Sequence, residues 1–234
     1  MANVTLDRPK NLSCRQPSIT STDQEFFVGN TTTRKSTSSL RIYHQNIRSL
    51  MSKKEELNVI MKDKSVNSHL ICLSEHHLKT QEITKFTLNS YKIAASFCGE
   101  EVPKGGVCIM TRHNIQFATI DLFSFCIERI FEICEIEVNS KNKKIIVGCI
   151  YRSPSGDIVQ FLELLEDTLS YLYKRSGSLI LCGDLNINFL LETPNKKRLD
   201  ILMKSYNLDQ IVDFPTRITH NLATLIDGIY LDTM

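Results

Sequence analysis

Five polar side chains stand where apolar segments of the sequence end, and their types suit phosphate chemistry. They are Asn46, Glu75, Tyr151, Asp184 and Asn186. A carboxylate in such a place can hold Mg²⁺, a hard cation that takes few protein oxygens and keeps several waters. A second carboxylate can orient or deprotonate water, and amides and a phenol can hold phosphate oxygens. The set predicts a metal-dependent site that cleaves a phosphodiester.

Each of these residues also has an ordinary explanation. Glu75 could face solvent in a loop, and Asn46 and Asn186 could be turn or cap residues. Tyr151 could be a partly buried core tyrosine, and Asp184 could belong to a plain turn. These alternatives stay open for each residue alone. The whole set favours a site, because independent turns would not be expected to supply this order and chemistry together.

Short apolar or alternating segments predict the strands that must position these side chains. Strand ends are where α/β folds build sites, because a rigid sheet aims short side chains into a common cleft. The predicted strands are residues 40–45, 69–74, 107–110, 129–138, 144–151, 178–182 and 225–231.

Segments whose apolar residues recur at helical spacing lie between several of these strands. Ser52 and Glu55 have the spacing of a capping box that would open a first helix. Asp157 is a plausible cap for a second helix, and residues 196–206 have the apolar spacing of a third. Alternating strands and helices predict an α/β domain, with a parallel sheet by default.

The composition is that of an ordinary globular chain, with 42% hydrophobic and 23% charged residues among 234. Residues 1–39 are rich in Ser, Thr, Asn and Gln and predict a disordered polar leader. Residues 40–234 predict one folded domain. The formal net charge of +2 gives no bulk attraction to nucleic acid, so such binding would need a local basic patch.

Eight cysteines occur without a C-x-x-C pair, several of them inside apolar runs. This usage is typical of free, buried thiols in a reducing compartment. The start of the chain shows no apolar signal region, and no stretch is long enough to span a bilayer. The adjacent His76 and His77 are too few for a zinc site. We therefore expect an intracellular protein without a membrane partner.

Seven short motifs follow one another along the chain: QNIRSL (45–50), LSEH (73–76), KGGV (104–107), IYRSP (150–154), GDLNIN (183–188), PTRIT (215–219) and LIDGI (225–229). By these motifs and their order, the chain resembles the endonuclease/exonuclease/phosphatase superfamily over residues 40–232, and most closely the apurinic-type endonuclease domain of non-LTR (LINE-like) retrotransposons.

The resemblance implies a fold and a set of roles. The fold would be an α/β four-layer αββα sandwich (DNase I-like), with two mixed β-sheets flanked by helices, in place of the parallel-sheet default. Glu75 would bind Mg²⁺ (or Mn²⁺), with Asn46 as its support. Asp184 would activate the attacking water, Asn186 would orient that water and the phosphate, and Tyr151 would contact the phosphate.

The resemblance also assigns residues near the end of the chain. Asp227 would orient a catalytic histidine, and Arg152, Thr216 and Arg217 would approach the DNA backbone. The family closes with a Ser-Asp-His motif, but no histidine follows Asp227 here. We therefore expect a domain that is incomplete at its C-terminus and lacks the last strand. Loss of such an electrostatic group costs on the order of 100- to 1,000-fold in rate.

A second departure is Arg48, which stands where many family members have an acidic residue. It implies a metal site that depends mainly on Glu75. The leading hypothesis is a nuclear, Mg²⁺-dependent DNA endonuclease of retrotransposon origin that nicks its target. One alternative is a catalytically inactive, truncated remnant with weak nucleic-acid binding. Another is a phosphoesterase of the same superfamily that acts on small molecules. Whether the chain is an active enzyme is left open, and its oligomeric state is not predicted.

Overall fold

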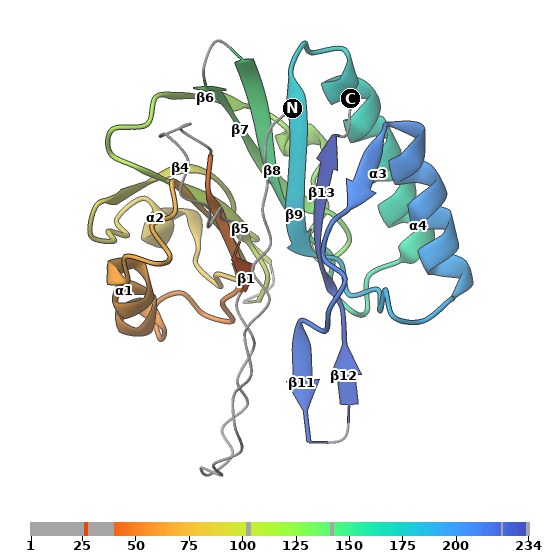
Figure 1. The fold of residues 1–234 in the computed structure, drawn as a ribbon, viewed down its shortest axis with the longest axis horizontal. Helices are drawn as coiled ribbons and strands as arrows, with labels where there is room; N and C mark the ends of the chain where they lie inside the picture. The colour runs from red at the N-terminus through yellow and green to blue at the C-terminus, as the bar shows by residue number, and fades with distance from the viewer. Residues whose placement is uncertain (1–25, 28–39, 102–103, 141–142, 221, 233–234) are drawn as a thin grey trace.

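Two β-sheets pack face to face, and helices cover the outer face of each (Figure 1). The computed structural model describes residues 26–27, 40–101, 104–140, 143–220 and 222–232. In spatial order, the first sheet contains β1 (Phe26–Phe27), β2 (Ile42–Asn46), β3 (Leu70–Ser74), β5 (Val107–Arg112) and β4 (Tyr91–Phe97). The second sheet contains β10 (Leu208–Gln210), β13 (Asp227–Asp232), β9 (Ser178–Asp184), β8 (Lys143–Tyr151), β7 (Glu132–Ser140) and β6 (Phe117–Ile120).

Helices α1 (Lys54–Lys62) and α2 (Thr80–Ile83) lie on the first sheet, and α3 (Ile158–Tyr173) and α4 (Pro194–Ser205) lie on the second (Figure 1). A short 3₁₀ helix, η1, spans Phe123–Phe125. Strands β11 (Arg217–Thr219) and β12 (Leu222–Thr224) form a separate hairpin that projects from one end of the sandwich. The expected four-layer α/β arrangement is confirmed.

Both sheets are mixed, which replaces the parallel-sheet default. Strands β2 and β3 pair in parallel, as do β8 and β9, whereas the other pairs of neighbouring strands are antiparallel. A parallel pair needs a long crossover, and α1 and α3 supply it in the two cases. Strands β7 and β8 are too close in sequence for a crossover, so they form a hairpin.

A layer of cysteine side chains lies between the sheets, two residues from the ends of the strands that carry them. Cys134, Cys149 and Cys182 are register partners on three adjacent strands. Cys72 lies across the sandwich from them, and the Cys149 thiol reaches the carbonyl oxygen of Leu73 at 3.5 Å. Small side chains let the two sheets approach closely. The ends of strands from different sheets are therefore brought together directly above this layer.

The N-terminal caps of two helices were predicted from the sequence, and the structure confirms one and contradicts the other. Asp157 caps α3 as expected, because its side chain accepts hydrogen bonds from the backbone N–H groups of Val159 and Gln160. The predicted capping box of α1 is wrong. Lys53 stands at the N-cap without a side-chain cap, and the Ser52 hydroxyl donates to the carbonyl oxygen of Ser49 instead.

Most of the predicted leader lies outside the described residues, so its disorder stays a prediction. The described part, Phe26–Phe27, forms β1 and pairs antiparallel with β2. Among the described residues, no helix is long and apolar enough to cross a membrane. The seven cysteines in this part of the chain are free, as the sequence suggested.

Candidate active site

Strand register brings the predicted site residues to one end of the sandwich. In the second sheet, Asp184 is the register partner of Tyr151 on one side and of Asp227 on the other. In the first sheet, Asn46 is level with Ser74, and Glu75 follows directly. Strand β9 ends on the side from which the β11–β12 hairpin projects (Figure 1). Five residues predicted from strand ends therefore lie together.

The amide of Asn46 connects the two sheets. Its Nδ2 group donates to Glu75 Oε1 at 2.7 Å and to Asp184 Oδ2 at 2.6 Å. Asn46 belongs to the first sheet and Asp184 to the second, 138 positions further along the chain. The amide therefore fixes the separation of two carboxylates that the sequence places far apart.

The turn after β9 holds Asp184 in place. A side chain at Gly183 would collide with the backbone of Ile150, so only glycine fits at this close approach of β8 and β9. Asp184 Oδ1 accepts the backbone N–H of Asn186 at 2.9 Å. Asn186 has a φ of +50°, and its side-chain amide donates to the carbonyl oxygen of Arg152 at 2.7 Å. The predicted turn and the predicted site are thus the same structure.

Arg152 supports this turn from inside the protein. Its guanidinium donates to the carbonyl oxygens of Leu185 at 2.9 Å, Asn186 at 2.9 Å and Gly156 at 2.8 Å. The side chain is buried. These three bonds give Arg152 a positioning role that the sequence did not suggest. Its contact with DNA stays a prediction.

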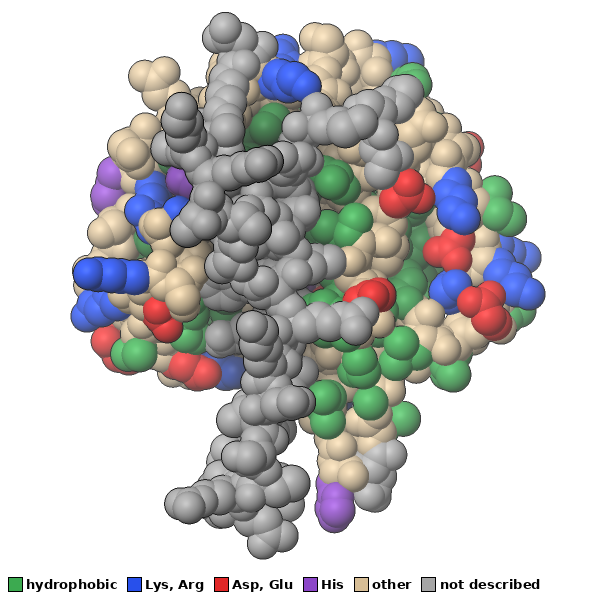
Figure 2. Space-filling view, in the orientation of Figure 1, with side chains coloured by type: hydrophobic (Ala, Val, Ile, Leu, Met, Phe, Trp, Pro, Cys, Tyr) green, Lys and Arg blue, Asp and Glu red, His purple; other side chains and the backbone are tan. Residues whose placement is uncertain are grey.

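Thr216 and Arg217 stand at the base of the hairpin. Thr216 is buried, and its hydroxyl accepts the backbone N–H groups of Ile226 and Asp227 at 3.2 and 3.3 Å. Arg217 is exposed, as are Ile218 and Leu222 on the same hairpin. Figure 2 shows hydrophobic side chains over this projection. Thr216 therefore ties the hairpin to the strand that carries Asp227.

Glu75 sits in a strained loop. Its φ is +54° and that of His77 is +58°, both in the left-handed region. His77 Nε2 lies 3.3 Å from Glu75 Oε2. The loop therefore turns the Glu75 carboxylate back toward Asn46 instead of out into solvent.

His76 faces the interior and serves the fold. Its Nδ1 accepts the backbone N–H of Leu78 at 2.9 Å, and its Nε2 lies 3.0 Å from the carbonyl oxygen of Phe97. Burial lowers the pKa of His76 to about 4, so the ring is neutral. Among the described residues, no group of three or more His, Cys, Asp or Glu side chains could hold a metal ion. Both nitrogens of the His76 ring thus contact groups of the protein itself.

The environments of Glu75 and Asp184 move their pKa values in opposite directions. Burial raises the pKa of Glu75, but hydrogen bonds from His77 and Asn46 outweigh it and leave this pKa below its usual value. Burial and the neighbouring Asp227 carboxylate raise the pKa of Asp184 well above its usual range. Two neighbouring carboxylates whose pKa values differ in this way suit different chemical tasks. Glu75 therefore favours its charged form, and Asp184 holds a proton more readily.

Tyr151 is buried beside these carboxylates. Burial and the charge of Glu75 raise its pKa, so the phenol keeps its proton. A protonated phenol can donate a hydrogen bond to a phosphate oxygen. The core and site explanations of Tyr151 are therefore compatible.

Three residues with positioning roles were missed from the sequence. His77 lies against Glu75, and Glu132 is the register partner of Tyr151. Asn188 Oδ1 accepts the backbone N–H of Leu225 at 3.2 Å, which joins the loop after β9 to the strand that leads into β13. The pairing of two predicted strands places Glu132 beside Tyr151, but its bond to Gly106 depends on the other sheet.

The oxygens at this end are of the kind that a hard divalent cation takes as ligands. Asn46 Oδ1 is buried and has no hydrogen-bond partner among the described residues. The other end of the same amide, Nδ2, donates to Glu75 Oε1. One carboxylate and one amide oxygen suit Mg²⁺, which is often held by one or two carboxylates while waters and phosphate oxygens complete its shell.

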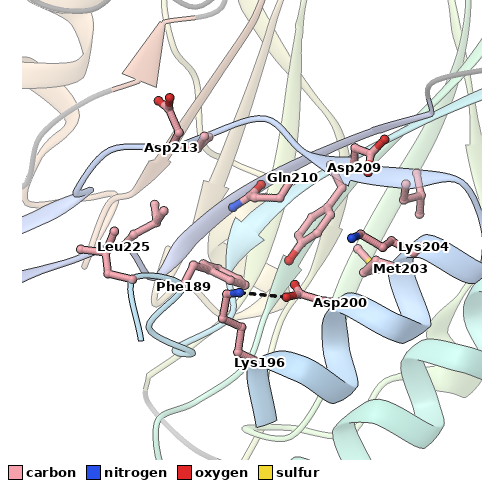
Figure 3. Close-up of a pocket in the computed structure, with 13 residues that line it drawn as sticks. Phe189, Lys196, Asp200, Met203, Lys204, Asp209, Gln210, Asp213 and Leu225 are labelled. Atoms are coloured by element: carbon pink, nitrogen blue, oxygen red, sulfur yellow. Dashed lines mark hydrogen bonds and ion pairs between the residues drawn. The ribbon is translucent and has the colours of Figure 1, made fainter. Parts of the chain in front are cut away.

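A depression of about 380 Å³ lies elsewhere, between α4 and the strands β10 and β13 (Figure 3). Its lining includes Lys196, which pairs with Asp200 at 3.0 Å and with Glu192 at 2.7 Å. None of the predicted site residues lines it. The arrangement that suits phosphate chemistry is therefore at the strand ends.

Comparisons with solved structures agree with the four-layer fold. The endonuclease domain of TRAS1, a telomere-specific non-LTR retrotransposon, has a TM-score of 0.65 and 13% identity and covers 83% of this chain and 85% of that one. The Xenopus laevis APE2 catalytic domain has a TM-score of 0.61, 17% identity and coverage of 82% of each chain. The 3'-5' exonuclease NExo from Neisseria meningitidis has a TM-score of 0.59 and 16% identity and covers 82% of this chain and 86% of that one. At these identities the likeness shows the fold alone.

Among curated proteins, none matches this chain. The model of the endonuclease/exonuclease/phosphatase family matches residues 34–232, which is most of the sequence. The match includes every strand of both sheets except β1. It also includes Asn46, Glu75, Tyr151, Asp184, Asn186 and Asp227. The chain belongs to the endonuclease/exonuclease/phosphatase family.

Proposed function

We propose that the chain is a Mg²⁺- or Mn²⁺-dependent DNA endonuclease, of non-LTR retrotransposon origin, that nicks a phosphodiester bond. The observation that carries this proposal is the Asn46 amide, which lies 2.7 Å from a Glu75 oxygen and 2.6 Å from an Asp184 oxygen. One of these carboxylates stays ionised, and the other has a raised pKa. This is the division between a cation ligand and a proton acceptor that metal-assisted hydrolysis requires.

The residues of the site can be given roles from their positions. A divalent cation held by the Glu75 carboxylate and the Asn46 amide oxygen would supply neutralisation of charge on the phosphate. Asp184 accepts the proton of the attacking water, and the Asn186 turn fixes the direction in which Asp184 points. Tyr151 donates its phenolic proton in a hydrogen bond to a phosphate oxygen. Asp227 helps to keep the pKa of Asp184 high, because it is a nearby like charge.

The projecting hairpin favours a polymer over a small phosphoester. Arg217 and the apolar Ile218 and Leu222 are exposed on it, and Thr216 joins it to Asp227. A positive charge at the base of a projecting arm suits a phosphate backbone that continues beyond the cleaved bond. The motifs of the retrotransposon type support DNA as the partner, and a nuclear location is part of the same proposal.

Nicking of a supercoiled plasmid tests this proposal. We expect the purified chain to convert the plasmid to its open circular form with Mg²⁺ and to lose this activity when EDTA removes the metal. Glu75→Gln keeps the volume of the side chain but removes its charge. We expect it to lower the nicking rate by about 100-fold, because a metal ion contributes several kcal/mol to the transition state.

Glu166→Gln is the matched control, since Glu166 is exposed on α3, on the outer face of the second sheet. It should nick at the wild-type rate. Nicking by Glu75→Gln at the wild-type rate would exclude this site. No nicking by the folded wild-type chain would favour the inactive remnant, and cleavage of a small phosphoester without DNA cleavage would favour a phosphoesterase.

A further inference from the structure

Glu132 is a buried carboxyl at the start of β7 that no step of the proposed reaction uses. Its side chain is almost completely buried. Its Oε2 accepts the backbone N–H of Gly106 at 2.5 Å, and its Oε1 accepts the backbone N–H of Arg129 at 2.8 Å. Because each oxygen holds a different N–H group, the side chain needs both oxygens as acceptors. A carboxylate provides them, whereas an amide provides one.

The bond to Gly106 ties β7 of the second sheet to the turn that enters β5 of the first sheet, and the bond to Arg129 fixes the Glu132 side chain within its own loop. Gly105 and Gly106 have φ values of +105° and +85°, which favour glycine. A side chain at Gly105 would meet the Glu132 carboxylate, and one at Gly106 would meet the ring of His76. This turn is therefore packed between Glu132 on one side and the Glu75 loop on the other.

The same turn holds the backbone of the loop that carries Glu75. The carbonyl oxygen of Gly105 accepts the N–H of His77 at 3.0 Å, and that of Gly106 accepts the N–H of His76 at 3.3 Å. The His77 ring lies 3.3 Å from Glu75. A continuous series of contacts thus runs from Glu132 through the glycine turn to the Glu75 carboxylate.

We propose that Glu132 is a positioning residue for the metal ligand: by fixing the Gly105–Gly106 turn, it holds Glu75 of the first sheet at a set distance from Asp184 of the second. This inference rests on the proposed function, in which Glu75 binds a divalent cation. The Asn46 amide and the Glu132 carboxylate are then two separate connections between the sheets at the site. Removal of either one lets the Glu75 loop move relative to Asp184.

Direct Mn²⁺ binding to the full chain tests this role without relying on turnover. The affinity is measured by calorimetry, at a pH above the value of about 7 to which burial raises the pKa of Glu132. We expect Glu132→Gln to weaken Mn²⁺ binding by about 10-fold, the lower end of the usual effect of losing a partner of a metal ligand. Glu132→Ala should weaken binding further, because no acceptor remains. Thermal unfolding of each variant establishes that it is folded at the temperature of the titration.

Glu135→Gln is the matched control on the same strand. Glu135 is as deeply buried, but β7 points it to the opposite face, away from the Glu75 loop. Its Mn²⁺ affinity should equal that of the wild type, so a general effect of altering β7 would show as a loss in both variants and would overturn the inference. Wild-type affinity in folded Glu132→Gln would overturn it too, while leaving the proposed function intact. Absence of Mn²⁺ binding by the wild-type chain would overturn both.

Discussion

Replacing Asp184 with asparagine is expected to lower the nicking rate by about 1,000-fold, the middle of the range for a lost general base. An amide of almost the same shape fills the position but cannot accept the proton of the attacking water. It also presents an N–H group to one of the two donors that Asp184 satisfies now, the Asn46 amide and the Asn186 backbone. The rate is measured with supercoiled plasmid at saturating Mg²⁺.

The stability of this variant should change in the opposite direction. Asp184 is buried beside Asp227, and its raised pKa means that the folded state disfavours the charged form. Asparagine is neutral at every pH, and we expect removal of the buried charge to outweigh the one hydrogen bond that the amide cannot accept. Asp184→Asn should therefore unfold at a temperature equal to or above that of the wild type near pH 7. A residue kept for catalysis at a cost in stability behaves in this way.

Asp167→Asn controls for the chemical change itself, because Asp167 is exposed on α3. It should leave both the rate and the unfolding temperature unchanged. An Asp184→Asn variant that nicks within about tenfold of the wild-type rate would show that Asp184 is not the proton acceptor. Loss of activity together with a marked loss of stability would assign Asp184 a structural role instead.

Local patterns predicted which residues lie together, because these residues stand at strand ends. Asp184 and Glu75 each follow an apolar run, and a rigid sheet places such residues together whatever the details of the loops. The Asp157 cap could also be predicted, because a helix cap depends only on residues within one turn. The capping box at Ser52 failed because the chain before it has positive φ at Arg48 and Ser49, which turns the Ser52 hydroxyl back to Ser49.

Roles that depend on pairing between distant strands could not be read from the sequence. Arg152 lies next to Tyr151 and would be expected to reach a ligand, but its guanidinium donates to three backbone carbonyls of neighbouring turns. Thr216 likewise serves the backbone of Ile226 and Asp227. Glu132 is separated by 26 positions from the Gly106 N–H that it accepts. Only the register of both sheets shows these residues to be supports of the site.

The buried Glu135 carboxyl is expected to make the free energy of unfolding depend strongly on pH. It lies on β7, on the face shared with Phe131, whose ring packs against Phe161 of α3 at 5.7 Å. Both of its oxygens are buried without a hydrogen-bond partner among the described residues. Burial raises the pKa of Glu135 from the ordinary 4.5 to about 8. The native state therefore holds a proton that the unfolded chain has released at neutral pH.

This difference in bound protons determines the direction in which stability changes with pH. Between pH 4.5 and about 8 the unfolded chain binds fewer protons at this residue, so the free energy of unfolding falls as the pH rises through that window. Each pKa unit is worth about 1.4 kcal/mol, so the loss at pH 7 is on the order of 3 kcal/mol. Glu135→Gln cannot release a proton. We expect it to be more stable than the wild type by that amount at pH 7 and equal to it at pH 4.

Urea unfolding of both proteins at a series of pH values between 4 and 9 measures this difference. Glu137→Gln on the same strand is the control, because Glu137 reaches Lys144 at 3.1 Å near the surface. It should leave the dependence of stability on pH almost unchanged in this range, since surface ion pairs contribute little. Parallel stability curves for the wild type and Glu135→Gln across the whole range would contradict the raised pKa. Curves that separate above pH 4.5 would show that this family member carries a buried acid on the face of β7 that points away from the Glu75 loop.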